Sequence, residues 1–142
     1  MPGITVGVDG SDHSRRALEW AVREAGLRGA PLTVLAVHPV ASNYWTGSPE
    51  RHPTDAPETE TVRQAAEDAV QKAVGQVGEP APTSVTVRAV TGVASRELVA
   101  ASADADLVVV GSRGGGGFAK MVLGSVASQV VRHSESPVVV IR

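Results

Sequence analysis

The stretch Val108-Val109-Val110-Gly111-Ser112-Arg113-Gly114, separated by nine residues from Gly124-Ser125, decides the fold of this chain. A run of valines without polar alternation is typical of a strand buried on both faces, as in a parallel sheet. The glycines that follow allow the backbone to approach an anion closely, and the N-terminus of a helix favours negative charge. The stretch therefore predicts a strand, a loop and a helix that form a cradle of backbone N–H groups for phosphate.

Apolar runs of the same kind recur along the chain and alternate with helical patterns. The predicted strands are Ile4–Asp9, Leu32–His38, Val85–Val90, Leu107–Gly111 and Val138–Ile141. The predicted helices are Ser14–Leu27, Glu60–Val77, Ser95–Ser102 and Ser125–Ser134, with Ser11 or Asp12 as a cap for the first and Gly29 as its end. Regular alternation implies right-handed crossovers, so we expect a doubly wound, open α/β/α sandwich around a five-stranded parallel sheet.

Composition narrows the class of protein. The length of 142 residues predicts a single domain, 1–142, whose one irregular segment is Pro39–Glu58, expected to be a lid or a disordered connection. A formal net charge of −2 does not indicate a nucleic-acid partner, and the absence of cysteine excludes disulfides and thiolate metal sites. The sequence shows no signal peptide and no apolar run of about 20 residues. We therefore expect a cytoplasmic location and no membrane partner.

Candidate ligand residues follow three of the predicted strands. Asp9 ends the first, Val37-His38 ends the second, and Gly111 to Gly114 follow the fourth. Ligands of open parallel sheets bind beyond the carboxyl ends of the strands, where the strand order reverses. In the assumed order 3-2-1-4-5 the first and fourth strands flank this point, so the Asp9 carboxylate and the glycines would meet in one crevice. An Asp-Gly-Ser sequence is also common in turns and helix caps, a structural role that the sequence alone slightly favours for Asp9.

Other motifs do not fit or remain open. A P-loop needs a lysine directly before the serine, and Gly124 stands before Ser125. The dinucleotide pattern Gly114-x-Gly116-x-x-Ala119 is met only because four glycines in a row satisfy many patterns. Arg113 is either a solvated loop charge or a partner for phosphate. The histidines, none at metal-ligand spacing, are His13, His38, His52 and His133, of which only His38 is expected near the crevice. No nucleophile–base pair is present.

From end to end, the chain resembles the universal stress protein family. The resemblance lies in Val6-Gly7-Val8-Asp9-Gly10-Ser11, in Ala105–Gly114 with the later Gly124-Ser125, and in Val130–His133 followed by Ser136–Val140. It implies a single-domain fold with strand order 3-2-1-4-5. The complete glycine motif is similar to that of the ATP-binding branch of the family, so the resemblance implies ATP as the ligand, with Mg²⁺.

The resemblance also implies a site made of three groups of residues. The nucleoside group is Val8, Asp9 and Val37, the last through its backbone to adenine. The ribose and phosphate group is Gly111, Arg113 and Gly114. The triphosphate group is Gly124, Ser125 and Val126. Ala127 departs from the many relatives that carry a hydroxyl residue there, which removes one expected phosphate contact.

Family members are usually dimeric through the last strand. The resemblance therefore implies a homodimer through Val138–Ile141, and the sequence agrees in part, because an exposed apolar edge strand is a template for pairing. The functional hypothesis is an ATP-binding regulatory or stress-response protein in which the nucleotide is a conformational signal. The alternatives are a slow ATP hydrolase or nucleotidyl transferase, ranked lower for want of a general base, and a dimerising adaptor with a vestigial nucleotide site.

Overall fold

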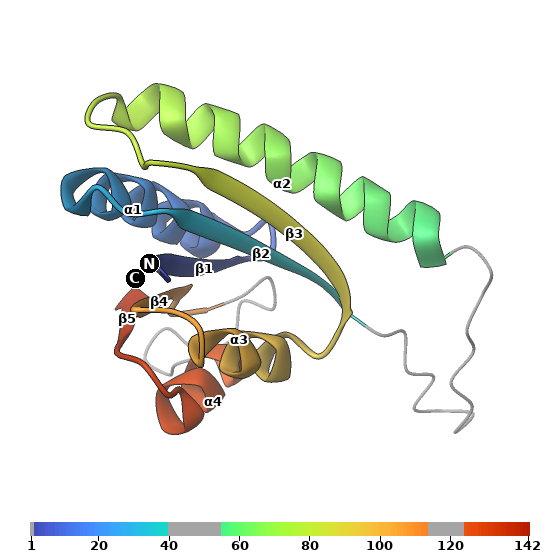
Figure 1. Ribbon diagram of the computed structural model, residues 1–142. Coiled ribbons are helices and arrows are strands. Elements are labelled where there is room, and N and C mark those ends of the chain that lie inside the picture. Colours follow the sequence, from blue (N-terminus) through green and yellow to red (C-terminus); the bar gives the residue numbers. More distant parts are fainter. Residues whose placement is uncertain (1, 40–54, 114–123) are drawn as a thin grey trace, which may run out of the picture.

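The computed structural model describes residues 2–39, 55–113 and 124–142 (Figure 1). Within these residues strands and helices alternate. Their bounds are β1 Ile4–Val8, α1 Asp12–Arg28, β2 Leu32–Pro39, α2 Asp55–Val77, β3 Val85–Gly92, α3 Ala94–Ser102, β4 Leu107–Gly111, α4 Ser125–His133 and β5 Val138–Ile141. No helix among the described residues is both long enough and apolar enough to cross a membrane.

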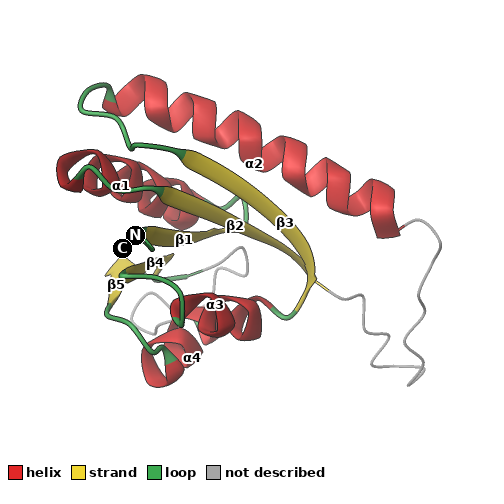
Figure 2. Ribbon diagram, in the orientation of Figure 1, coloured by secondary structure: helices red, strands yellow, loops and turns green. Residues whose placement is uncertain are grey.

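The five strands form one parallel sheet in the order β3-β2-β1-β4-β5, which confirms the predicted order. Helices α1 and α2 cover one face of the sheet, and α3 and α4 cover the other (Figures 1 and 2). Strand β1 lies at the centre, with β2 on one side and β4 on the other. The strand order therefore reverses between β1 and β4, where a ligand crevice was expected.

The valine runs are buried on both faces, as predicted. Alternate side chains of β4 point to opposite faces of the sheet: Val109 packs in the cluster under α1 and α2, while Val108 and Val110 pack in the cluster with α3 and α4. Val108 and Val109 have no exposed surface. This double burial fixes both the position and the register of β4, and hence the point at which the chain leaves the sheet.

Most element ends agree with the sequence. Ser11 caps α1 by accepting a hydrogen bond from the Ser14 N–H, and Gly29 ends the helix in the left-handed conformation, with φ of 61°. The bounds predicted for the irregular segment, Pro39–Glu58, are wrong at both ends, because Pro39 still belongs to β2 and α2 already begins at Asp55. Proline is tolerated in the first turn of a helix, which allows α2 to start before Pro57. The proposed lid lies in residues 40–54, outside the described residues.

Candidate functional site

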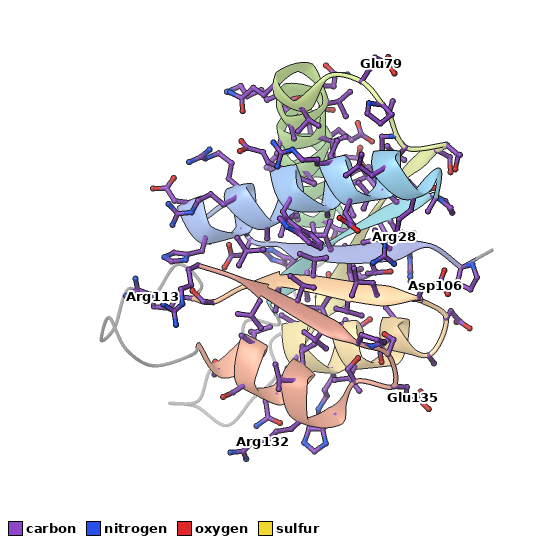
Figure 3. All side chains as sticks on the ribbon, turned by 90° about the vertical axis from the view of Figure 1, so that its left-hand side faces the viewer. Arg28, Glu79, Asp106, Arg113, Arg132 and Glu135 are labelled. Carbon is purple, nitrogen blue, oxygen red and sulfur yellow. The ribbon has the colours of Figure 1, made fainter. Side chains whose placement is uncertain are left out.

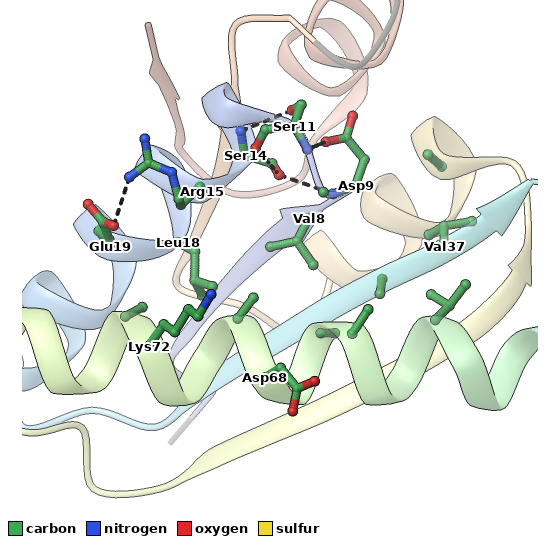
Figure 4. Close-up of a pocket in the computed structure, with 18 of the residues that line it drawn as sticks. Val8, Asp9, Ser11, Ser14, Arg15, Leu18, Glu19, Val37, Asp68 and Lys72 are labelled. Atoms are coloured by element: carbon green, nitrogen blue, oxygen red, sulfur yellow. Dashed lines mark hydrogen bonds and ion pairs between the residues drawn. The ribbon is translucent and has the colours of Figure 1, made fainter.

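The carboxyl end of β1 turns directly into α1 through a hydrogen-bonded loop. The Asp9 Oδ1 atom accepts from the Ser11 N–H at 2.9 Å, which is an Asx turn. The Ser14 hydroxyl accepts from the Asp9 N–H at 3.2 Å and donates to the Ser11 carbonyl at 3.1 Å (Figure 4). The turn role predicted for Asp9 is confirmed, and the turn explains why β1 ends at Val8 rather than at Asp9. Asp9 is exposed at the carboxyl end of the sheet.

A large cavity lies beside this turn, between α1, α2 and the carboxyl-terminal halves of β1 and β2. Its volume is about 760 Å³, within the usual range for small-molecule sites. Three predicted nucleoside residues, Val8, Asp9 and Val37, line it. The rest of its lining is mostly apolar, but each of the two helices also contributes charged side chains. The remaining lining residues are Gly10, Ser11, Ser14, Arg15, Leu18, Glu19, Ala36, Val62, Ala65, Ala66, Asp68, Ala69, Lys72, Ala73, Gln76 and Ala94.

Ser112 joins the end of β4 to three other elements. Its N–H donates to the Ile141 carbonyl of β5 at 2.7 Å, and its carbonyl accepts from the Gly124 N–H at 2.6 Å. Its hydroxyl lies 3.1 Å from Nδ1 of His13 in the first turn of α1. Ser112 is only 8% exposed. These contacts hold the start of α4 beside the end of β4, although the residues between them, 114–123, lie outside the described residues.

Close packing explains the glycine at position 111. A Cβ atom on Gly111 would lie 2.9 Å from the backbone carbonyl carbon of His13 and 3.0 Å from its oxygen. Backbone atoms at that distance cannot give way cheaply, so only glycine lets the start of α1 approach the end of β4. The structure thus gives Gly111 a packing role besides the ligand role that the resemblance implied.

The N-terminus of α4 has the properties of an anion site. The first N–H groups of an α-helix lack partners within the helix. Gly124 is the N-cap residue, and it has no side chain that could accept hydrogen bonds from them. No acidic residue lies in the first turn, so the partial positive charge of the helix end is not offset there. Ser125 is exposed and Val126 is half-buried. The backbone groups of these residues could therefore hold a phosphate group.

The structure brings most of the predicted site residues to one end of the sheet, in two groups. The nucleoside residues line the cavity beside α1 and α2, whereas Gly111, Arg113, Gly124 and Ser125 do not line it and lie around the end of β4. Arg113 lies at the opposite end of the molecule from Arg28 and Asp106 (Figure 3). Gly114 lies outside the described residues. Among the described residues, no group of three histidine, cysteine, aspartate or glutamate residues could hold a metal ion.

Sequence reasoning missed His13. Besides its contact with Ser112, its Nε2 atom lies 3.4 Å from Nη2 of Arg113. The partners are 99 and 100 residues apart in the chain, so no local pattern could pair them. The only available signal was the strand order, which places the start of α1 next to the end of β4. His38, the histidine singled out from the sequence, lies in β2 and does not line the cavity.

A model of the universal stress protein family matches residues 2–142. The chain belongs to the universal stress protein family. It is 34% identical over 139 residues to a universal stress protein of Mycolicibacterium smegmatis, which covers 98% of this chain and 47% of that protein. The chain thus spans about half the length of the curated relatives that it matches.

Solved structures of universal stress proteins share the fold. UspA from Lactobacillus plantarum has a TM-score of 0.77 and 26% identity, covering 99% of this chain and 97% of that one. A universal stress protein solved in complex with cAMP has a TM-score of 0.67 and 30% identity, covering 99% and 95%. A universal stress protein from Archaeoglobus fulgidus solved in complex with dAMP has a TM-score of 0.62 and 26% identity, covering 99% and 97%. Adenine nucleotides therefore bind to two structural relatives of this chain.

Proposed function

We propose that this universal stress protein binds ATP across the reversal point of its sheet and uses the nucleotide as a conformational signal. The observation that carries the proposal is the N-terminus of α4, whose N-cap residue Gly124 supplies no capping side chain and which Ser112 holds beside the end of β4. It offers N–H groups and a positive helix end at the same end of the sheet as a cavity of the size of a small-molecule site. The relatives solved with cAMP and dAMP support an adenine nucleotide as the ligand.

The proposed pose divides the nucleotide between the two groups of residues. The nucleoside lies at the end of the cavity formed by Val8, Asp9 and Val37, with the Val37 backbone facing adenine. Gly111 and Arg113 lie along the ribose and phosphates, and we propose the same ligand role for Gly114, which is outside the described residues. Gly124, Ser125 and Val126 hold the triphosphate at the start of α4. We propose that Mg²⁺ is held by the phosphates, since the described protein residues form no cluster that could hold it alone.

We further propose that the single domain 1–142 pairs with a second copy through β5, and that the protein acts in the cytoplasm, where ATP is available. The residues of β5 are only half-buried, and β4 covers one of its two edges. The N–H groups of Val108 in β4 and of Ser112 directly after it donate to the carbonyls of Pro137 and Ile141, respectively. Successive residues of a strand direct their backbone N–H and C=O groups to opposite sides. The N–H of Val140 therefore faces away from β4, toward the open edge where a symmetry mate could pair.

The proposal is tested first by extracting the purified protein with acid and identifying the released nucleotide, and then by thermal unfolding with and without Mg-ATP. Ligand at about 100 times its dissociation constant adds about 2.7 kcal/mol to the free energy of unfolding. We expect bound adenine nucleotide and a rise in the unfolding temperature. Release of phosphate during the incubation, lost in Ser125→Ala, would favour hydrolysis instead. A protein that carries no nucleotide and shows no shift would contradict the proposal.

Gly124 offers a matched pair of variants that locates the phosphates. Gly124→Asp and Gly124→Asn both place an oxygen that caps α4, so both should be at least as stable as the wild type without ligand. Only the aspartate adds a negative charge at the proposed phosphate position. We therefore expect Gly124→Asp to lose ATP affinity much more than Gly124→Asn, measured by calorimetry. Equal affinities in the two variants would place the phosphates elsewhere.

A further inference from the structure

We propose that His13 is a positioning residue that holds the Arg113 guanidinium toward the phosphates with a neutral imidazole whose proton is on Nδ1. The inference rests on the proposed function for the identity of the ligand, and on the described contacts for the geometry. His13 lies in the first turn of α1 and faces the end of β4, with Nδ1 3.1 Å from the Ser112 hydroxyl and Nε2 3.4 Å from Nη2 of Arg113.

The partner on one side fixes the tautomer. A guanidinium can only donate hydrogen bonds, so a hydrogen bond between Arg113 and Nε2 of His13 needs Nε2 to accept with its lone pair. In a neutral imidazole with an unprotonated Nε2, the proton is on Nδ1, and the Nδ1–H group donates to the Ser112 hydroxyl oxygen. An imidazolium would present two N–H donors and no acceptor, and it could not accept from Arg113. The proposed hydrogen bond between Arg113 and Nε2 therefore forms only with the neutral ring.

The ring is held in place from both sides. The backbone of His13 packs against Gly111 so closely that a Cβ there would lie 2.9 Å away. The backbone N–H of Ser112 donates to Ile141 and its carbonyl accepts from Gly124, so the hydroxyl that accepts the hydrogen bond from Nδ1–H of His13 belongs to a fixed residue. Because His13 is fixed at the junction of α1, β4 and α4, its contact with Arg113 also fixes the position of the Arg113 side chain.

A neutral acceptor suits this task better than a carboxylate. An aspartate at the same place would orient Arg113 but would also cancel its charge and repel an incoming phosphate. The imidazole accepts a hydrogen bond and adds no negative charge beside the guanidinium. Because a guanidinium has five N–H donors in a planar fork, a bond to His13 is compatible with phosphate recognition. His13 would therefore favour phosphorylated ligands over the bare nucleoside.

The first test needs no ligand. ¹⁵N NMR of the imidazole nitrogens of His13 in the whole chain, at about pH 8.5 where an ordinary imidazole is neutral, reports which nitrogen carries the proton. We expect the proton on Nδ1 in the wild type and a shift toward the Nε2–H form in Arg113→Ala. A wild type with the proton on Nε2 would overturn the proposed geometry.

The second test separates the two contacts of His13 with paired variants. In His13→Gln the amide oxygen reaches the position of Nε2 and can accept from Arg113, whereas in His13→Asn the shorter side chain keeps only the Ser112 contact. The readout is the ratio of the adenosine and Mg-ATP dissociation constants, with Arg113→Ala as the reference. We expect His13→Asn to lower this ratio about tenfold, the value of one charge-assisted hydrogen bond, and His13→Gln to retain it.

The outcomes of the second test are distinct. His13→Asn should have no further effect in the Arg113→Ala background, because both changes remove the same interaction. If His13→Gln and His13→Asn behave alike, or if neither changes the ratio, the positioning role is wrong. If the wild type binds no adenine nucleotide at all, the proposed function and the phosphate role of His13 both fail, while the tautomer measurement still decides the bond to Arg113.

Discussion

Replacing Gly111 by alanine should destabilise the protein even without ligand. Gly111 is the last residue of β4, and its backbone is packed against the first turn of α1. The added Cβ would lie 2.9 Å from the carbonyl carbon of His13 and 3.0 Å from both the oxygen and the Cβ of that residue. Real Cβ atoms do not approach backbone atoms so closely, so the start of α1 or the end of β4 has to move.

The size of the effect follows from the kind of atoms involved. Forcing one extra carbon into a closely packed site costs about 1–3 kcal/mol, and these three neighbouring atoms cannot all rotate away because two of them are backbone atoms. For a chain of this length, 1 kcal/mol corresponds to about 4 °C in unfolding temperature. We therefore expect Gly111→Ala to unfold about 4–12 °C below the wild type.

The assay is thermal unfolding of the nucleotide-free protein followed by circular dichroism, with Gly75→Ala as the matched control. Gly75 lies inside α2, is exposed, and has no atom within 4 Å of the position of an added Cβ. The same substitution there should stabilise the protein by about 0.5–1 kcal/mol through helix propensity. A Gly111→Ala protein as stable as the wild type would refute the packing role of this glycine.

Three further outcomes are expected. Gly26→Ala should lower the unfolding temperature despite the gain in helix propensity, because its Cβ would collide with the carbonyl oxygen of Pro80. Ser102→Ala should lower the free energy of unfolding in urea by about 0.5–1.5 kcal/mol, the net value of a typical hydrogen bond, because the buried hydroxyl accepts from the Glu135 N–H at 2.9 Å and the variant removes that acceptor. Val140→Pro should yield a monomer in sedimentation with the β4–β5 hydrogen bonds intact, since the lost N–H faces away from β4; a dimer that persists would contradict pairing through β5.

The sequence predicted the fold well because the relevant signals are local. Unbroken valine runs such as Val108–Val110 indicate burial on both faces, and that burial is what the two core clusters show. Ser11 and Gly29 bound α1 by cap chemistry that depends only on neighbouring residues. The start of α2 was misplaced because a proline near a helix start is compatible with either a loop or a first turn.

The candidate site was predicted less completely, because its contacts join distant parts of the chain. The strand ends identified Asp9 and the glycines, whereas the bond between His13 and Arg113 depends on the exact approach of α1 to β4. That approach is set by the packing of Gly111 and by the two backbone bonds of Ser112, neither of which leaves a spacing pattern. The roles of the site residues toward a nucleotide stay predictions.

The most direct test of the central claim is to follow the backbone amide signals of the ¹⁵N-labelled chain by NMR during separate titrations with adenosine and with Mg-ATP. Adenosine should shift the signals of Asp9 and Val37 beside the cavity. Mg-ATP should shift these and, in addition, the signals of Ser125 and Val126 at the start of α4, because only the phosphates reach the uncapped helix end. ATP that leaves the signals of Ser125 and Val126 unchanged, or that shifts none of these residues, would contradict the account.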